Sequence, residues 1–294
     1  MTYTFIIDRC PDLPVAAVCR VMKVSPSAFY AWRAEPCSDR VWDDAALCNR
    51  VVDIHRMSRH SYGSPRVHAE LRLGEGIRCS RKRVERLLRE TGRAGIHRRR
   101  RQGCTRRDPD AQPSSDLVNR CFHPDRADRL WVMDVTEHPT GEGKVYLAVV
   151  LDAFSRRAVG WSIGDHIRAE LVVDAVQMAL WQRRPPAGQT IAHSDHGSQY
   201  TSWAFGRRLR AGGLLASMGS IGDCFDNAMA ESFFGTIQLE LFDTRHWATR
   251  QQLASAIFEW IEAWYNPTRR HSALGWLSPA TYETTTTTDA VEAA

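Results

Sequence analysis

Three apolar runs rich in β-branched residues follow one another closely between residues 130 and 163. They cover residues 130–136, 144–152 and 158–163. Because only short connections separate them, this spacing predicts three antiparallel strands joined as a meander. The pattern then predicts a helix over residues 168–182, a strand near 190–193, a helix over 202–210 and a short strand at 214–217. This order of elements indicates an α/β domain built on a mixed sheet.

Asp134 stands inside the first of these apolar runs. A carboxylate in a central strand loses hydration worth on the order of several kcal/mol unless a positive group compensates for it. Pairing with one arginine is the ordinary outcome for a single buried acid. Two further acids change this expectation, because Asp195 follows the strand near residues 190–193 and Glu231 lies on a later helix.

The helix that carries Glu231 has an apolar residue at every fourth position, namely Met229, Phe233, Ile237 and Leu241. This spacing predicts a buried stripe and turns Glu231 toward a different face. We therefore expect Asp134, Asp195 and Glu231 to converge at one edge of the sheet. A carboxylate cluster without matching cations is typical of a site for Mg²⁺, which prefers oxygen ligands.

The N-terminal third of the chain is strongly basic, whereas the remainder is mildly acidic. Residues 1–110 hold 23 Lys and Arg against 13 Asp and Glu, and residues 111–294 hold 16 against 21. A basic region of this kind indicates binding to a polyanion such as nucleic acid. All but three of the 39 basic residues are arginine. Arginine suits bidentate phosphate contacts, but the codon usage of a GC-rich genome explains the same bias.

Helical patterns fill the basic region. Residues 15–22 and 25–32 fit two helices joined by a tight turn, with Ser25 as the N-cap of the second. Such a pair suits a helix-turn-helix that presents Ser27 and Tyr30 outward to DNA, and plain packing fits it equally well. Further helices are expected over residues 41–59, from residue 64 to the glycines at 74 and 76, and from an N-cap at Ser80 to Gly92.

A run of cations begins with the helix that Ser80 caps. Arg81 and Lys82 open that helix, and Arg98, Arg99, Arg100 and Arg101 follow it in a stretch without acidic residues. Neighbouring cations repel one another and favour phosphate contact, although a charge run can also be a solvated face. We expect these residues to contact nucleic acid.

The composition also predicts the domain organisation. Residues 108–115 have the composition of a linker. We expect a helical DNA-binding region over residues 1–107, a linker over 108–127, an α/β domain over 128–283 and a disordered tail over 284–294. No apolar stretch approaches the roughly 18 residues of a membrane span, and the eight cysteines contain no CxxC pair that could hold structural zinc. A cytosolic chain with reduced cysteines is the expectation.

Several segments together resemble one known family. They are WVMDVT at 131–136, SDHGSQYTS at 194–202, DNAMAESFF at 226–234 and YNPTRRHSALG at 265–275. In this order, and with 35 residues between Asp195 and Glu231 (231 − 195 − 1), they resemble the OrfB-type transposases of the bacterial IS3 insertion-sequence family. The resemblance covers nearly the whole chain, because YGSPRVHAEL at 62–71 and RVERLLRETG at 83–92 are similar to the helix-turn-helix segment that precedes the core in that family.

The resemblance implies an α/β fold of the RNase H-like integrase type, a mixed five-stranded sheet flanked by helices, preceded by an all-α helix-turn-helix region. It implies a DDE active site in which Asp134, Asp195 and Glu231 hold two Mg²⁺ ions, with Mn²⁺ able to replace them. The reaction would be strand cleavage by water and strand transfer by the freed 3′-hydroxyl. Partners would be double-stranded DNA (terminal inverted repeats and target), an OrfA-type protein or fusion, and further copies of the chain, in the bacterial cytoplasm at the nucleoid.

One departure from the family concerns Gln238, because the family commonly carries a basic residue seven positions after the glutamate, where it is expected to touch the DNA end. We expect DNA contacts from Gln238, and from His196 beside the second aspartate. The cluster from Tyr265 to His271 fits either DNA binding through Arg269 and Arg270 or packing of the final helix. Two other classes of function fit the pattern: an RNase H-type metal-dependent nuclease without strand transfer, and a non-catalytic DNA-binding regulator.

Overall fold

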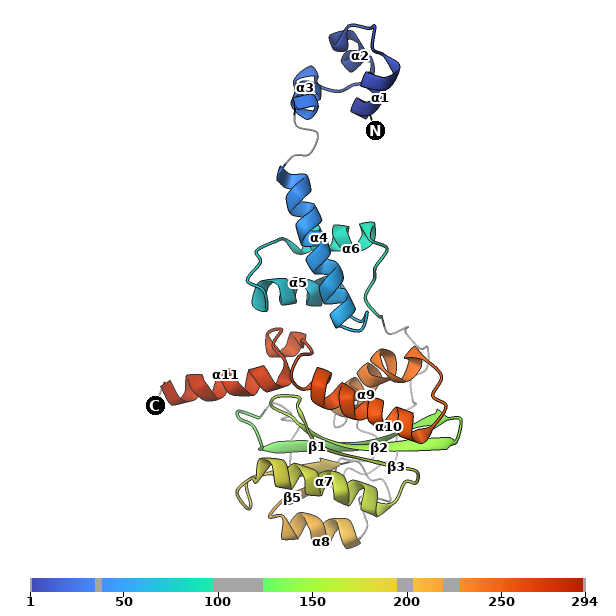
Figure 1. Cartoon of the computed structure of the whole chain (residues 1–294). Helices are drawn as coiled ribbons and strands as arrows, with labels where there is room; N and C mark the ends of the chain where they lie inside the picture. Colours follow the sequence, from blue (N-terminus) through green and yellow to red (C-terminus); the bar gives the residue numbers. More distant parts are fainter. Residues whose placement is uncertain (1, 35–38, 98–123, 195–202, 219–227, 293–294) are drawn as a thin grey trace, which may run out of the picture. The chain divides into compact units, whose positions relative to one another are not determined.

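The computed structural model of the chain describes residues 2–34, 39–97, 124–194, 203–218 and 228–292, without the side chains beyond residue 286. The chain divides into two compact units, Met1–Gly95 and Ile96–Ala294 (Figure 1). The expected linker at residues 108–115 and the basic arm from Arg98 to Arg101 lie outside the described residues. No described helix is long and apolar enough to cross a membrane.

The helices α1 (Thr2–Arg9), α2 (Val15–Val21) and α3 (Pro26–Ala34) pack around a small apolar core. Its buried members are Ile6, Val18, Cys19 and Phe29. Lys23 has a φ of 54° in the turn between α2 and α3, and the amide of Phe29 donates to the carbonyl of Ser25 at the start of α3. The expected pair of helices with a tight turn is confirmed.

The helices α4 (Asp39–Met57), α5 (Ser64–Leu73) and α6 (Arg81–Glu90) form a second bundle, in which each contacts the other two. The Ser80 hydroxyl accepts a hydrogen bond from the Arg83 amide at 3.2 Å and so caps α6 as expected. Val84, Leu87 and Leu88 form the buried stripe of α6. Gly92 ends the helix with a φ of +66°, a conformation that glycine adopts without strain.

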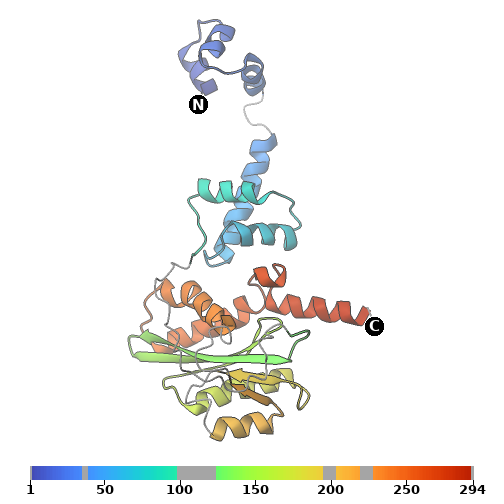
Figure 2. The same cartoon turned by 180° about the vertical axis from the view of Figure 1, so that it is seen from behind.

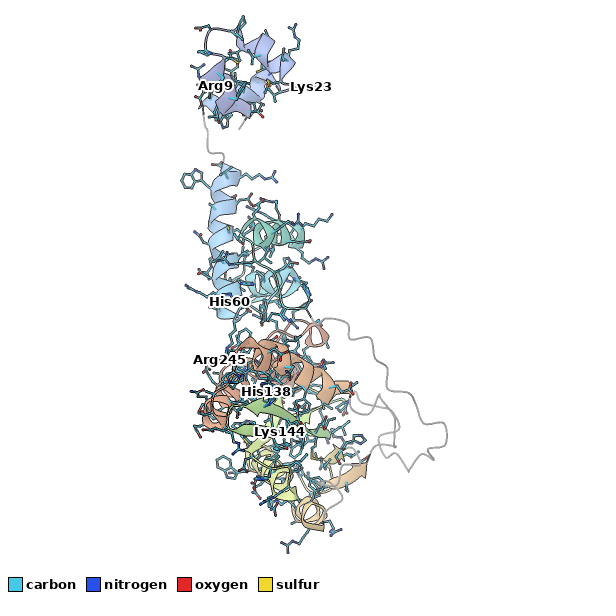
Figure 3. All side chains as sticks on the ribbon, turned by 90° about the vertical axis from the view of Figure 1, so that its right-hand side faces the viewer. Arg9, Lys23, His60, His138, Lys144 and Arg245 are labelled. Atoms are coloured by element: carbon cyan, nitrogen blue, oxygen red, sulfur yellow. The ribbon has the colours of Figure 1, made fainter. Side chains whose placement is uncertain are left out.

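The segment after α6 returns to the junction between α4 and α5. A Cβ atom on Gly95 would lie 2.4 Å from the Gly63 amide nitrogen, so the two backbones touch only because Gly95 has no side chain. His55, which is buried, contacts the Ala94 carbonyl oxygen through Nε2 at 3.2 Å. Its Nδ1 lies 3.2 Å from Nδ1 of His60, which follows α4 (Figure 3). These contacts hold the chain in position just before the basic arm begins.

The second unit is built on a sheet with the strand order β3-β2-β1-β4-β5. β1 (Leu130–Thr140), β2 (Gly143–Asp152) and β3 (Ala158–Gly164) form an antiparallel meander, and β4 (Ile191–Ser194) and β5 (Leu215–Met218) extend the sheet in parallel with β1. The predicted mixed five-stranded sheet is confirmed.

Helices cover both faces of this sheet (Figures 1 and 2). α7 (Ala169–Arg183) and α8 (Trp203–Ala211) lie on one face, where Trp131, Met133 and Val150 of the sheet belong to their core. α9 (Ala228–Glu240) and α10 (Arg250–Glu259) lie on the other face. Gly160 of β3 allows α7 to approach closely, because a Cβ atom at this position would lie 2.2 Å from the Ala175 carbonyl oxygen.

The expectation of a disordered tail from Thr284 is wrong, because α11 (Pro279–Glu292) continues through the threonine run. The Thr284 hydroxyl donates to the Ala280 carbonyl at 2.8 Å, and the Thr285 hydroxyl donates to that of Thr281 at 2.9 Å. Threonine is a poor helix former because its hydroxyl competes for backbone partners; here the competition is resolved by bonds to the preceding turn. Composition alone does not reveal this arrangement.

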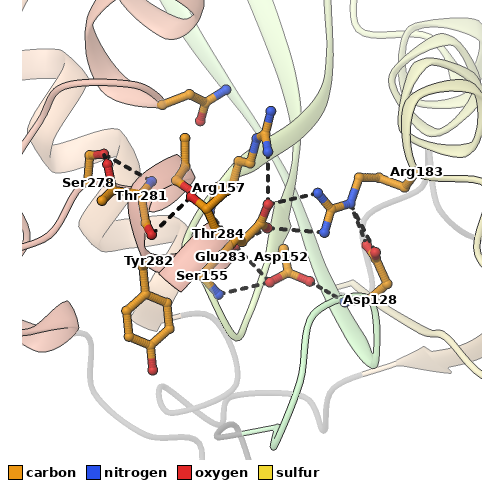
Figure 4. Close-up of polar contacts among 12 residues, drawn as sticks. Asp128, Asp152, Ser155, Arg157, Arg183, Ser278, Thr281, Tyr282, Glu283 and Thr284 are labelled. Atoms are coloured by element: carbon orange, nitrogen blue, oxygen red, sulfur yellow. Dashed lines mark hydrogen bonds and ion pairs between the residues drawn. The ribbon is translucent and has the colours of Figure 1, made fainter. Parts of the chain in front are cut away.

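A partly buried ionic cluster joins α11 to the sheet (Figure 4). The Glu283 carboxylate accepts hydrogen bonds from Arg157 at 2.8 Å and from Arg183 at 2.9 and 3.1 Å. Ser155 donates to the same carboxylate at 2.7 Å and to Asp152 at 2.9 Å. Burial opposes the charge of Arg183, but its bonds to Asp128 and Glu283 raise its pKa above the usual value. The cluster thus fixes α11 at Glu283, directly before the segment that was expected to be disordered.

Candidate active site

Asp134 lies on β1 opposite Val149 of β2 and is half-buried. Its sequence neighbours Met133 and Val135 pack toward α7. Because side chains alternate between the faces of a strand, Asp134 points toward the face that α9 covers. One carboxylate oxygen accepts a hydrogen bond from the Val135 amide at 2.7 Å. Asp134 is therefore not an acid buried inside the apolar core under α7.

The parallel strand β4 brings a second position close to Asp134. In the β1–β4 register, Met133 lies opposite Ser194, the last residue of β4. The next residue in the sequence is Asp195, which lies outside the described residues together with His196. His193, by contrast, is buried, and its Nδ1 lies 3.1 Å from the Ser217 hydroxyl of β5. His193 thus joins β4 to β5.

Glu231 lies in the first turn of α9 and is exposed. The predicted stripe is present, since Phe233, Ile237 and Leu241 are buried and Met229 is half-buried. α9 contacts β1. The helix therefore carries Glu231 on the same face of the sheet as Asp134, with its carboxylate near the positive end of the helix dipole.

Two of the three expected carboxylates are therefore described, on β1 and on α9. Among the described residues no three His, Cys, Asp or Glu side chains form a group that could hold a metal ion. Asp195, the third expected ligand, is not among those residues. The described residues show that β1 pairs with β4 and contacts α9.

Comparison with known proteins identifies the family. Models described as "Integrase core domain" match residues 124–224 and 213–279, and an "HTH-like domain" model matches residues 42–101. Transposase InsF for insertion sequence IS3A of Escherichia coli (strain K12) is 35% identical over 285 residues, which are 96% of this chain and 98% of the relative. The chain belongs to the IS3 family of insertion-sequence transposases.

Two further proteins are similar to this transposase. The transposase for insertion sequence element IS629 of Shigella sonnei is 37% identical over 92% of this chain and 91% of its own length. A solved structure of the HTLV-2 integrase catalytic core domain in complex with magnesium aligns with a TM-score of 0.42 and 15% identity, over 55% of this chain and 99% of that one. The full-length relatives and the matched models identify a DDE transposase, an enzyme of the polynucleotidyl transferase class with an integrase core and a helix-turn-helix-like domain.

The residues of this transposase that were expected to contact DNA fall into distinct environments. Ser27 and Tyr30 are exposed on α3, and Arg81 and Lys82 are exposed at the start of α6. Among the described residues neither Arg81 nor Lys82 takes part in an ion pair. The positions of Arg98, Arg99, Arg100, Arg101 and His196 lie outside the described residues.

The other cations of α6 are engaged within the protein. Asp44 of α4 accepts a hydrogen bond from Arg83 at 2.6 Å and another from Arg86 at 2.6 Å. Both bonds lower the pKa of Asp44 below its usual value. Arg89 lies 3.5 Å from Glu85. The number of cations in the α6 sequence is therefore larger than the number that is available to a ligand. Arg81 and Lys82 are the strongest candidates on α6 for contact with DNA.

Near the C-terminus the expectations for DNA contacts are only partly compatible with the structure. Arg269 is only 4% exposed and is paired with Glu240, so the expected DNA contact through this side chain is wrong. Arg270 is half-buried and donates to the Trp276 carbonyl at 3.2 Å. Gln238 is half-buried and donates to the Asp243 carboxylate at 2.5 Å. The sequence could not reveal these partners, because they depend on tertiary packing for Arg269, on the turn after α9 for Gln238 and on the loop over residues 270–276 for Arg270.

Proposed function

We propose that Asp134, Asp195 and Glu231 form the catalytic carboxylate site of this transposase. The observation that carries the proposal is the pairing of Met133 with Ser194, because each of these residues directly precedes one of the two aspartates. The contact between α9 and β1 supports the third member, since α9 carries Glu231 on the face to which Asp134 points.

The donor set suits a hard divalent cation. Asp134 and Glu231 offer carboxylate oxygens, the ligands that Mg²⁺ prefers, and the described ion pairs do not include Glu231. We propose that the three carboxylates hold two Mg²⁺ ions, which Mn²⁺ can replace. When bound, such ions activate the attacking oxygen and stabilise the leaving oxygen of an in-line displacement at phosphorus.

The three carboxylates serve two successive displacements. In cleavage, a water oxygen forms a bond to phosphorus and the bond from phosphorus to the 3′ oxygen of the element breaks. In joining, that 3′ oxygen forms a bond to a target phosphorus and a 3′ oxygen of the target strand leaves. Neither step requires a covalent bond to the protein, so the side chains act by holding charge and orientation.

DNA is the proposed partner of both units. We propose that Arg81, Lys82 and the arginines from Arg98 to Arg101 contact phosphates of the terminal inverted repeats, with Ser27 and Tyr30 of α3 as further contacts. Gln238 and Arg270 are proposed contacts on the integrase core. An OrfA-type partner, assembly of several copies on DNA, and action at the nucleoid in the bacterial cytoplasm belong to the same proposal.

An assay with labelled DNA tests this function. The full chain, with and without an OrfA-type partner, is incubated with Mg²⁺ and a duplex that carries the element ends found beside this reading frame. We expect end-specific nicks and joined products. Cleavage of RNA–DNA hybrids without a need for these ends would favour the nuclease instead, and binding without any cleavage would favour the regulator.

A further inference from the structure

The segment from Tyr265 to His271 begins at the end of the π-helical turn Trp260–Tyr265 that follows α10, and four of its side chains are buried. Asn266, Arg269 and His271 are polar, yet they are exposed by only 5%, 4% and 7%. Side chains that are this inaccessible do not serve as a DNA-binding surface. Buried polar groups need specific partners, and two of the elements that supply them to this segment are α9 and the sheet; the Asn266 carbonyl also accepts a hydrogen bond from the Ala280 amide of α11 at 3.0 Å.

The first partner is the C-terminal end of α9. Arg269 donates to Glu240, the last residue of α9, through Nη2 at 2.8 Å and through Nε at 3.0 Å. Trp264 donates to the same carboxylate at 3.3 Å. Removing one member of such a buried pair leaves an uncompensated charge, so the pair ties the end of α9 firmly to this segment.

The same segment also holds the N-terminal half of α9. Phe233 lies two residues after Glu231 and contacts the rings of Tyr265 and Trp260 edge-on, with centroid distances of 4.8 and 5.6 Å. Tyr265 and Trp260 are stacked on each other at 4.9 Å. Phe233 and both partner rings are buried. These contacts restrict the rotation of α9 about its own axis close to Glu231.

The second partner is β3 of the sheet together with the turn that precedes it. The Tyr265 hydroxyl donates to the Arg156 carbonyl oxygen at 3.0 Å, and burial raises the pKa of Tyr265, so the hydroxyl keeps its proton. The Asn266 side chain bonds both backbone polar groups of Ala158 in β3, accepting from its amide and donating to its carbonyl, each at 3.0 Å. Asn266 thus binds β3 as a neighbouring strand would.

We propose that Tyr265, Asn266 and Arg269 are positioning residues that set Glu231 on α9 relative to Asp134 on the sheet. The segment bonds α9 through Arg269 and packs on it through the Tyr265 ring, and it bonds β3 through Asn266 and the turn before β3 through the Tyr265 hydroxyl. This inference rests on the proposed catalytic role of Glu231. A displacement of about 1 Å at a reacting group lowers a rate by up to about 100-fold, so a loosened segment is expected to act on turnover.

The test uses Tyr265→Phe, which keeps the ring contacts and removes the bond to Arg156, and Asn266→Asp, which keeps the shape and cannot donate to Ala158. Thr268→Ala is the matched control, because Thr268 is exposed within the same segment. Each full-length variant is compared with the wild type in thermal unfolding, in affinity for the duplex of element ends, in the joining rate at saturating DNA, and in Mn²⁺ binding without DNA by electron paramagnetic resonance.

We expect the joining rate of folded Tyr265→Phe and Asn266→Asp to fall by about 10-fold or more and their Mn²⁺ affinity to weaken, with DNA affinity and the Thr268→Ala variant unchanged. An unchanged joining rate or Mn²⁺ affinity in the folded Tyr265→Phe variant would overturn the inference. So would a loss of DNA affinity with an unchanged rate at saturation. The joining rate of Glu231→Gln is measured in parallel. If this variant still joins DNA, the proposed function fails. If it is inactive while the Tyr265→Phe and Asn266→Asp variants are fully active, only the positioning role is rejected.

Discussion

Met133 of β1 and Ser194 of β4 are paired in a parallel ladder, and an aspartate follows each of them in the sequence. This relationship connects two positions that are separated by 60 residues (194 − 133 − 1). Parallel strands need a crossover to reach the same end of a sheet, and here α7 forms that crossover. The pairing supports the proposal that two aspartates distant in the sequence share one site.

The close approach of Gly95 to Gly63 gives a matched pair of substitutions. A Cβ on Gly95 would meet backbone atoms of Gly63 at 2.4 and 2.5 Å, whereas a Cβ on Gly63 would meet Gly95 at an ordinary 3.6 Å. We expect Gly95→Ala to destabilise the α4–α6 bundle by more than about 2 kcal/mol and Gly63→Ala by less than about 1 kcal/mol. Hydrogen exchange of α4–α6 peptides in the full chain measures both. Equal effects would mean that the two backbones do not touch.

The buried His55 predicts that acid weakens the same bundle. Burial, and then the nearby His60 and Arg93 charges, lower the pKa of His55 although its bond to Ala94 opposes the change. A histidine with a folded-state pKa below its unfolded value stabilises the protein above the unfolded value, and this contribution is lost as the pH falls. We expect faster hydrogen exchange in α4–α6 at pH 5.5 than at pH 7.5, after correction for intrinsic rates. His55→Gln, which can still donate to Ala94, should reduce this difference; the same difference in both proteins would exclude His55 as its source.

Asp152 predicts the opposite pH dependence in the second unit. Burial raises the pKa of this carboxyl to about 6, even though the amides of Asp128 and Ser155 donate to it. Because the folded state binds the proton more tightly than the unfolded state, this contribution is complete below pH 3.8 and is lost as the pH rises through about 6. We expect the stability of the wild type relative to Asp152→Asn to fall by up to about 3 kcal/mol between pH 4 and 7. Urea unfolding at several pH values measures this difference, and a constant difference would contradict the raised pKa.

The contrasting environments of the α6 cations predict different effects on DNA binding. Replacing both Arg81 and Lys82 by alanine should weaken binding to any sequence and reduce the slope of log affinity against log salt by about 0.9 for each phosphate that is no longer neutralised. Arg83→Ala should instead destabilise the α4–α6 bundle, because it removes a partner of Asp44. Affinity is titrated at several salt concentrations. If Arg83→Ala flattens the slope as much as the double substitution, the assignment of Arg81 and Lys82 as the exposed contacts fails.

The sequence predicted most elements of this fold because their signals are local. The Ser80 cap, the Gly92 terminus and the three β-rich runs depend on neighbours within a few residues. The sequence failed where the answer depends on tertiary partners. Arg269 looks like a basic residue beside other cations, and only the folded chain brings it to Glu240, from which 28 residues separate it (269 − 240 − 1). Thr284 lies in a threonine run whose composition predicts disorder, because the partners that hold neighbouring Glu283 are distant in the sequence, at Ser155, Arg157 and Arg183.

The central claim concerns the three carboxylates, and conservative substitution tests it most directly. Asp134→Asn, Asp195→Asn and Glu231→Gln each remove one negative ligand with almost no change in shape. Cleavage and joining of labelled element ends by each full-length variant are measured in Mg²⁺ beside DNA affinity and thermal unfolding. We predict that all three variants fold and bind DNA nearly as the wild type does and that none gives detectable cleaved or joined product. Strand transfer by any one of them would contradict the account.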